Sequence, residues 1–141
     1  MAYTTTADLK TYLGVTGSGD DALLATLISA AQEAIDQYCN RTFEASADST
    51  RYFTYGRDTD NFNLWLDEDL CAITTVTNGD SVAVAADEYT TIPKNETPYY
   101  KLRILASASK AWEYDEDPED AISIAGKWAY SATAPADIVL A

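Results

Sequence analysis

Apolar residues recur at helical spacing through the first third of the chain. Between positions 21 and 38 they repeat every three or four residues, which predicts a long amphipathic helix that starts at Asp20 or Asp21 and ends near Asn40. Its apolar members are Leu23, Leu24, Leu27, Ile28, Ala31, Ala34, Ile35 and Tyr38. A shorter helix is predicted before it, with Thr6 as its N-cap and Gly14 at its end. Residues 1–43 are therefore expected to be helical.

From about residue 50 the pattern changes to short alternating and aromatic runs, which are typical of strands. Strands are predicted at residues 51–55, 62–66, 73–77, 81–84, 89–92, 99–105 and 121–130. The dipeptide Asn78-Gly79 predicts a tight hairpin, because both turn residues must tolerate positive φ. Pro135 fits the first position of a last helix over residues 133–141. That helix is too short to stand alone, so we expect that it docks on something or that the natural chain continues.

The order of these elements indicates an α+β fold. A helical hairpin, made of the short and the long helix, precedes a mostly antiparallel β-sheet and the start of a C-terminal helix. With 141 residues, 47% of them apolar, the chain is expected to form a single domain over residues 1–141. Its parts would be helical (1–43), β (50–131) and a C-terminal helix start or arm (133–141). Two cysteines far apart in sequence, Cys39 and Cys71, are expected to be buried core thiols.

The charge of the chain changes what it is expected to bind. Twenty-three acidic residues against nine basic ones give a net charge of −14, which repels nucleic-acid phosphates and anionic membranes. Histidine is absent, which removes the Ser-His-Asp and Cys-His catalytic systems and the histidine zinc motifs. We expect no secretion signal and no membrane span, hence a cytoplasmic location. A halophilic origin would also explain the acidity.

The densest acidic run, residues 113–120, is the first candidate for chemistry. Its candidate residues are Asp115, Glu116, Asp117, Glu119 and Asp120. The run lacks the central glycine and the alternate spacing of an EF-hand calcium loop, so it is expected to be a solvated loop. A weak calcium site and a role for negative charge itself are the alternatives. No metal site, cofactor or enzymatic activity is predicted, and a carboxylate-based hydrolase is a distant possibility.

Aromatic residues are concentrated in the sheet half, where they serve the core and, as amphipathic side chains, suit protein interfaces. The candidate partner interface consists of Tyr99, Tyr100, Trp128, Tyr130, Ile138, Val139 and Leu140. The main alternative is a small acidic β-rich module that binds carbohydrate or another small ligand. Such a module would use Trp65, Trp112 or Trp128 as a stacking platform.

Several segments together resemble a known family. They are residues 9–15, 20–24 and 35–41 at the start, residues 73–80 with Tyr89 in the middle, and residues 122–131 with 134–138 at the end. In these segments the chain resembles the head–tail connector (adaptor) proteins of tailed bacteriophages. The resemblance spans most of the chain and is carried by short apolar and turn signatures.

The resemblance implies a non-enzymatic protein of the virion neck that is assembled in the host cytoplasm. About twelve copies would form a ring that binds the portal protein after DNA packaging and offers a platform to a stopper or tail-completion protein. DNA would cross the ring without sequence-specific binding, and an acidic lumen would let it slide. Ring subunits make head-to-tail contacts between unlike patches. The exposed side of the long helix and the aromatic strands are the candidates for those patches.

Overall fold

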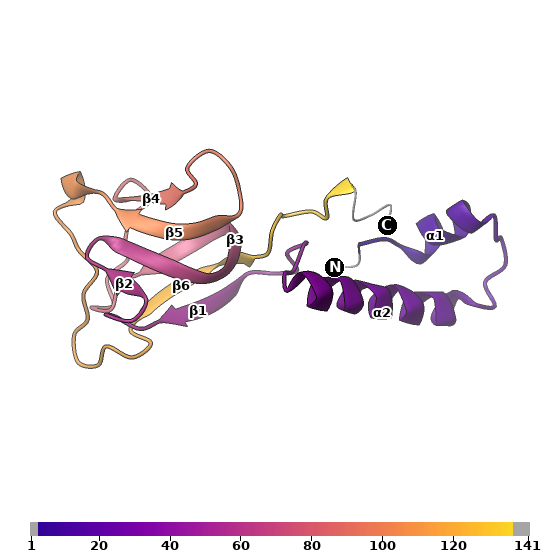
Figure 1. The fold of residues 1–141 in the computed structure, drawn as a ribbon, viewed down its shortest axis with the longest axis horizontal. Coiled ribbons are helices and arrows are strands. Elements are labelled where there is room, and N and C mark those ends of the chain that lie inside the picture. Colours follow the sequence, from indigo (N-terminus) through magenta and orange to yellow (C-terminus); the bar gives the residue numbers. More distant parts are fainter. Residues whose placement is uncertain (1–2, 137–141) are drawn as a thin grey trace.

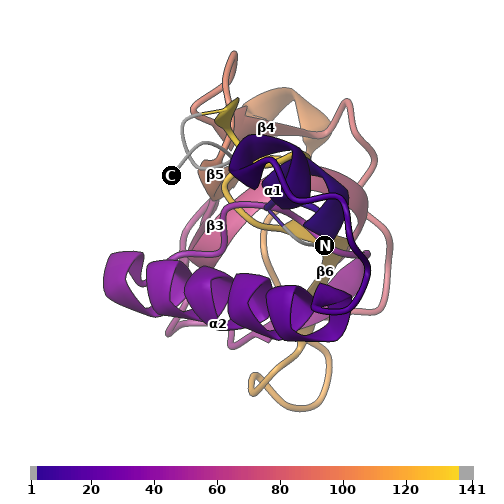
Figure 2. The same ribbon diagram turned by 90° about the vertical axis from the view of Figure 1, so that its right-hand side faces the viewer.

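A curled antiparallel sheet with two helices projecting from one end makes up the fold (Figure 1). It was obtained as a computed structural model that describes residues 3–136. The two helices are α1 (Thr6–Leu13) and α2 (Asp21–Cys39), and we call α1, α2 and the link between them the helical arm. Figure 2 views the molecule from the arm's end, with α1 and α2 in front of the sheet. The fold is α+β, as predicted.

Local capping sets the ends of both helices close to the predicted positions. The N-cap of α1 is Thr5 rather than Thr6, because the Thr5 Oγ1 accepts a hydrogen bond of 3.1 Å from the Asp8 N–H. Gly14 ends α1 with a φ of 69°, a left-handed conformation that glycine adopts without a Cβ penalty. Helix α2 starts after Asp20 and ends at Asn40, which is also left-handed.

The sheet is ordered β1-β6-β3-β5-β4, with β2 paired to β3, and every pairing is antiparallel. Its strands are β1 (Ser49–Phe53), β2 (Thr59–Asp60), β3 (Asn63–Thr77), β4 (Tyr89–Ile92), β5 (Tyr99–Ile104) and β6 (Ile122–Trp128). The long β3 pairs with β5 through its first half and with β6 through its second half. A short 3₁₀ turn, Ala106–Ala108, follows β5.

The hydrophobic core lies inside the curl of the sheet. Its buried side chains are Phe53, Leu64, Leu70, Val76, Val84, Leu102, Ile104, Trp112, Ile122, Ile124 and Trp128. Every one of them comes from the β half of the chain. The sheet therefore forms a core without any contribution from the helical arm.

Three of the predicted strands differ clearly from the structure. Residues 62–66 and 73–77 were predicted as separate strands, but both belong to the continuous β3. The acidic triplet 67–69 breaks the apolar alternation, so its sequence is typical of a loop. In the structure the triplet lies within the strand, at a shift in the register between β3 and β5. Arg51 binds Asp67 and Glu68 there, and Arg41 binds Asp69. Residues 81–84 form no strand and share a single bridge with β3, between Ala83 and Thr77.

The chain reversal at Asn78 is wider than the predicted two-residue hairpin. The Ser81 N–H donates to the Asn78 oxygen and the Asn78 N–H to the Val82 oxygen, and Ser81 takes the positive φ of 65°. This is a three-residue loop whose left-handed position is Ser81 rather than Gly79. Gly79 is needed for space, because a Cβ there would collide with the backbone oxygen of Glu113.

Gly126 in β6 is also fixed by close contact. A Cβ at this position would collide with the backbone oxygen of Ala72 on β3. We expect Gly126→Ala to lower the free energy of unfolding by about 1–3 kcal/mol, because the paired strands must move apart. Urea denaturation measures this, with Gly19→Ala as the control, since a Cβ on Gly19 meets open space. Equal stability of the two variants would contradict the packing of β3 on β6.

Candidate functional site

Only part of the apolar surface of the helical arm is shielded from solvent within the subunit. Neither α1 nor α2 contains a buried residue. On α2 the half-buried apolar positions Leu24, Ile28 and Ile35 lie on one side of the helix, together with Gln32. The Gln32 Oε1 accepts a hydrogen bond of 3.3 Å from the Tyr3 N–H. This inner side is the one that the N-terminal segment covers.

A second apolar side of α2, about 100° around the helix from the first, is exposed. We call it the α2 stripe, and it consists of Leu23, Leu27, Ala30, Ala31, Ala34 and Tyr38. Leu23 is 58% exposed and Tyr38 is 93% exposed. A second exposed patch lies at the end of α1 and in the link to α2. We call it the α1 patch, and it consists of Tyr12, Leu13 and Val15, of which Tyr12 is 87% exposed. Large apolar surfaces of this kind mark interaction sites in soluble proteins.

Tyr3 anchors the arm to the sheet. Its hydroxyl donates a short hydrogen bond to Asp36 on α2 and accepts one of 3.0 Å from the Phe43 N–H. The Tyr3 and Phe43 rings meet edge to face with centroids 6.2 Å apart, and Phe43 packs in turn on Tyr130 at 6.0 Å. The Tyr130 N–H donates to the Thr42 oxygen at 2.8 Å, which closes the connection. A chain of aromatic contacts thus joins the end of α2 to the sheet.

The environment of Tyr3 makes the attachment of the arm sensitive to alkaline pH. Burial, followed by the hydrogen bond to Asp36, raises the pKa of Tyr3 from 10.0 to about 12. The folded state therefore holds the phenolic proton more tightly than the unfolded state does. The resulting stabilisation is complete below pH 10 and is lost as the pH rises towards 12.

We expect one tyrosine to titrate late in an ultraviolet absorbance titration of the folded protein, and Tyr3→Phe to remove that late step. The same variant should lose helical circular dichroism, because it deprives Asp36 and the Phe43 N–H of their partner. Tyr12→Phe is the matched control, since Tyr12 is almost fully exposed. A late step that survives in Tyr3→Phe would show that Tyr3 does not hold the arm.

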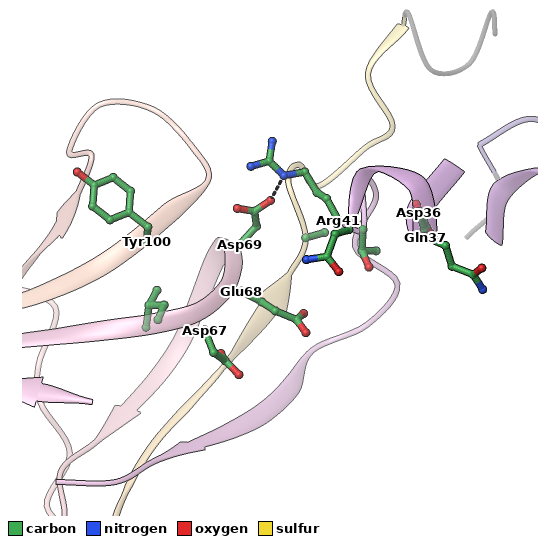
Figure 3. A pocket seen from close by; sticks show the side chains of 11 residues that line it. Asp36, Gln37, Arg41, Asp67, Glu68, Asp69 and Tyr100 are labelled. Carbon is green, nitrogen blue, oxygen red and sulfur yellow. Dashed lines mark ion pairs between the residues drawn. The ribbon is translucent and has the colours of Figure 1, made fainter. Parts of the chain in front are cut away.

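A groove of about 610 Å³ opens between the end of α2 and β3 (Figure 3). Its charged and aromatic lining residues are Asp36, Arg41, Asp67, Glu68, Asp69 and Tyr100. The Arg41 Nε binds the Asp69 Oδ2 at 2.6 Å, and the Arg41 guanidinium also lies over the Tyr130 ring. Asp67 and Glu68 both bind Arg51. Four carboxylates line the groove, and three of them are ion-paired within the subunit.

The predicted acidic loop is exposed and lies at the end of the sheet remote from the arm, at the lower left of Figure 1. All five candidates, Asp115, Glu116, Asp117, Glu119 and Asp120, are exposed. The loop is held by its backbone, since the Tyr55 N–H donates to the Pro118 oxygen at 2.9 Å and the Asp120 N–H to the Thr54 Oγ1 at 3.3 Å. The Tyr55 and Tyr114 rings pack at 5.0 Å beside it. The carboxylates are thus presented to solvent on a fixed loop.

The structure separates the predicted interface residues. Tyr100 is exposed at the groove, Tyr99 and Tyr130 are half-buried, and Trp128 is buried in the core. The Trp128 Nε1–H donates to the Ser49 oxygen at 3.1 Å, and the ring lies under Arg51. Ile138, Val139 and Leu140, with most of the predicted C-terminal helix, lie outside the described residues. A role in partner binding stays a prediction for all seven.

Comparison with known proteins bears on the part of the chain that builds the arm and the first half of the sheet. The sequence model of the phage gp6-like head-tail connector protein family matches residues 3–77, just over half of the chain. The chain belongs to this family. No curated protein and no solved structure matches it.

As a phage connector, the protein is a virion component that assembles with other head–tail proteins, and its family is structural. The described helices include none long and apolar enough to cross a membrane. Among residues 3–136, no group of three or more acidic or thiol side chains is arranged to hold a metal ion.

The stacking platform of the alternative interpretation is largely absent from the connector's surface. Trp112 is 2% exposed, and its Nε1–H donates to the Phe62 oxygen at 2.8 Å. Trp128 is buried as well, so neither ring can stack on a sugar. Trp65 is exposed, but the Lys101 ammonium lies 4.4 Å from its ring centroid. Of the three candidate tryptophans, only Trp65 therefore has a ring accessible to a sugar.

Sequence reasoning missed Tyr3 and misjudged Cys39. Nothing in the pattern around Tyr3 distinguishes it, because its partners Asp36 and Phe43 are far away in sequence. Cys39 was expected in the core but is exposed, because α2 projects from the sheet and contributes no residue to the core. Cys71 is half-buried, and burial raises the pKa of its thiol.

Proposed function

We propose that this connector is a ring subunit of the virion neck. It binds the portal protein after DNA packaging, presents a platform to a stopper or tail-completion protein, and surrounds the channel through which DNA leaves. The observation that carries the proposal is the family match over residues 3–77, which includes the whole helical arm with its uncovered apolar surface. About twelve copies form the ring, and the neck is built in the host cytoplasm.

In this proposal the chain acts as one domain over residues 1–141. Helices α1 and α2 form a hairpin, and residues 133–141 begin a C-terminal helix that contacts a partner. Tyr99, Tyr100, Trp128, Tyr130, Ile138, Val139 and Leu140 belong to the surfaces that meet the portal and the stopper. Tyr100 is favoured among them by its exposure at the rim of the groove.

The net charge of −14 supports a channel role. DNA that crosses a ring must pass without sticking, and carboxylates repel its phosphates. We assign this role to the acidic loop, whose five carboxylates are exposed and project from a backbone held by the turn that follows β1. DNA then passes through the ring without being bound by it.

The proposal is tested by an affinity pull-down of the tagged protein from phage-producing cells, with and without crosslinking. We expect mass spectrometry to identify a portal protein and a stopper or tail-completion protein among the bound chains. Tyr3→Phe, which loosens the arm, should reduce this recovery relative to Tyr52→Phe, which changes an exposed tyrosine of β1 outside the arm. Recovery of no virion protein after crosslinking would contradict the proposed function.

A further inference from the structure

We propose that the α2 stripe of one copy packs against the α1 patch of the next copy, so that the helical arms make the subunit contact of the ring. This inference rests on the proposed function and names the surface that performs it. The partner is a second copy of this chain. The proposal is supported by the presence of two different apolar patches on the same projecting arm.

The first argument is the lack of a core in the arm. An isolated helix of 8 residues, such as α1, is marginal in water, and helices in proteins gain most of their stability from packing of an apolar face. In α2 the apolar arc includes both the half-buried side and the α2 stripe, yet only the first is covered. The contacts described between α1 and α2 include one ion pair, between the Lys10 Nζ and the Asp21 Oδ1 at 2.7 Å. A neighbour must supply the rest of the packing.

The absence of charge from both patches allows another copy of this chain to be that neighbour. Copies with a net charge of −14 repel one another and can approach closely only where carboxylates are absent. The α2 stripe and the α1 patch contain no charged residue. The three carboxylates of α2, on Asp21, Glu33 and Asp36, lie on other sides of the helix. An uncharged apolar patch is also the composition that homo-oligomer interfaces favour.

The area of the two patches fits a modest contact that is repeated around a ring. Tyr12 and Tyr38 are almost fully exposed, and burying an aromatic side chain removes about 150–250 Å² from water. With Leu13, Val15, Leu23, Leu27 and the three alanines, the contact reaches roughly the 1,000 Å² that a specific interface requires. The alanines in the middle of the stripe let a second helix approach closely. Ring closure then adds avidity to each weak contact.

The exposed aromatics of the sheet are less suited to this contact. Tyr55 and Tyr114 already pack on each other, and Trp65 lies under Lys101. A closed ring also needs two different patches on each copy, because a patch that binds itself yields only a dimer. The arm provides such a pair.

The test is a charge placed in the stripe. We expect Ala31→Glu to weaken self-association at least tenfold, measured by sedimentation of the full chain with and without the portal protein. Ser29→Glu adds the same charge to the exposed opposite side of α2 and should leave association unchanged. Circular dichroism shows whether both variants keep their helices.

Crosslinking tests which patches meet. In a Cys39→Ser, Cys71→Ala background, Tyr12→Cys and Ala31→Cys variants should form a disulfide-linked dimer when mixed, but not when either is oxidised alone. Homodimers of Ala31→Cys alone would overturn the head-to-tail contact. Rings that tolerate Ala31→Glu would overturn the inference and leave the proposed function standing. A chain that never associates, even with the portal, would contradict both.

Discussion

Replacement of Trp112 by alanine is expected to lower the free energy of unfolding by about 3–5 kcal/mol. Trp112 is among the largest fully buried side chains of the described core, and its indole N–H satisfies the Phe62 oxygen at 2.8 Å. The substitution leaves a cavity between β3 and the loop that carries residue 112, and it also removes the hydrogen bond. Urea denaturation followed by circular dichroism measures the effect.

Two variants separate packing from other roles of tryptophan. Trp112→Phe keeps most of the ring volume but loses the hydrogen bond, so it should cost about 1–3 kcal/mol. Trp65→Ala removes a ring that is 47% exposed and its contact with Lys101, and should cost about 1 kcal/mol or less. If Trp112→Ala were as mild as Trp65→Ala, the core described for this sheet would be wrong.

Neutralisation of the acidic loop is expected to slow DNA release several-fold while particles assemble normally. The variant carries Asp115→Asn, Glu116→Gln and Glu119→Gln, three exposed side chains whose loss breaks no hydrogen bond described for the loop. Fewer carboxylates along the channel repel phosphates less, so DNA is retained longer. The measurement is the rate of DNA ejection from purified particles.

A matched variant controls for net charge. Glu33→Gln, Asp87→Asn and Glu96→Gln also remove three exposed carboxylates, but from three other parts of the chain. Ejection should stay at the rate of the parent in this control. The slowing in the loop variant should also diminish at high salt, because salt screens exposed charges. If the parent and the loop variant form intact particles and eject DNA at equal rates, the loop does not line the channel.

The sequence predicted the helices and the strand-rich half well because their signals are local. Thr5 caps the start of α1, and Gly14 and Asn40 cap the ends of α1 and α2. Each cap involves residues only a few positions away in the sequence. Strands β4 and β5 lie within the predicted runs. The continuity of β3 could not be predicted, since it depends on Arg41 and Arg51, which bind the acidic triplet from elsewhere in the chain.

The candidate site was only partly predictable, for a related reason. Apolar periodicity shows which side of α2 avoids water, but it does not show whether the same subunit covers that side. Leu24 and Leu23 are neighbours with equal apolar character, and only the structure separates the half-buried one from the exposed one. The exposure of Tyr100 and the burial of Trp128 likewise follow from the curl of the sheet, which no local pattern encodes.

The most direct measurement of the central claim is native mass spectrometry of portal particles incubated with the purified connector. The account predicts that the portal gains a fixed whole number of chains, close to twelve, as one cooperative step, and that Ala31→Glu prevents this step while Ser29→Glu does not. Portal particles whose mass stays unchanged at saturating connector, or that take up copies singly without a preferred number, would contradict the account.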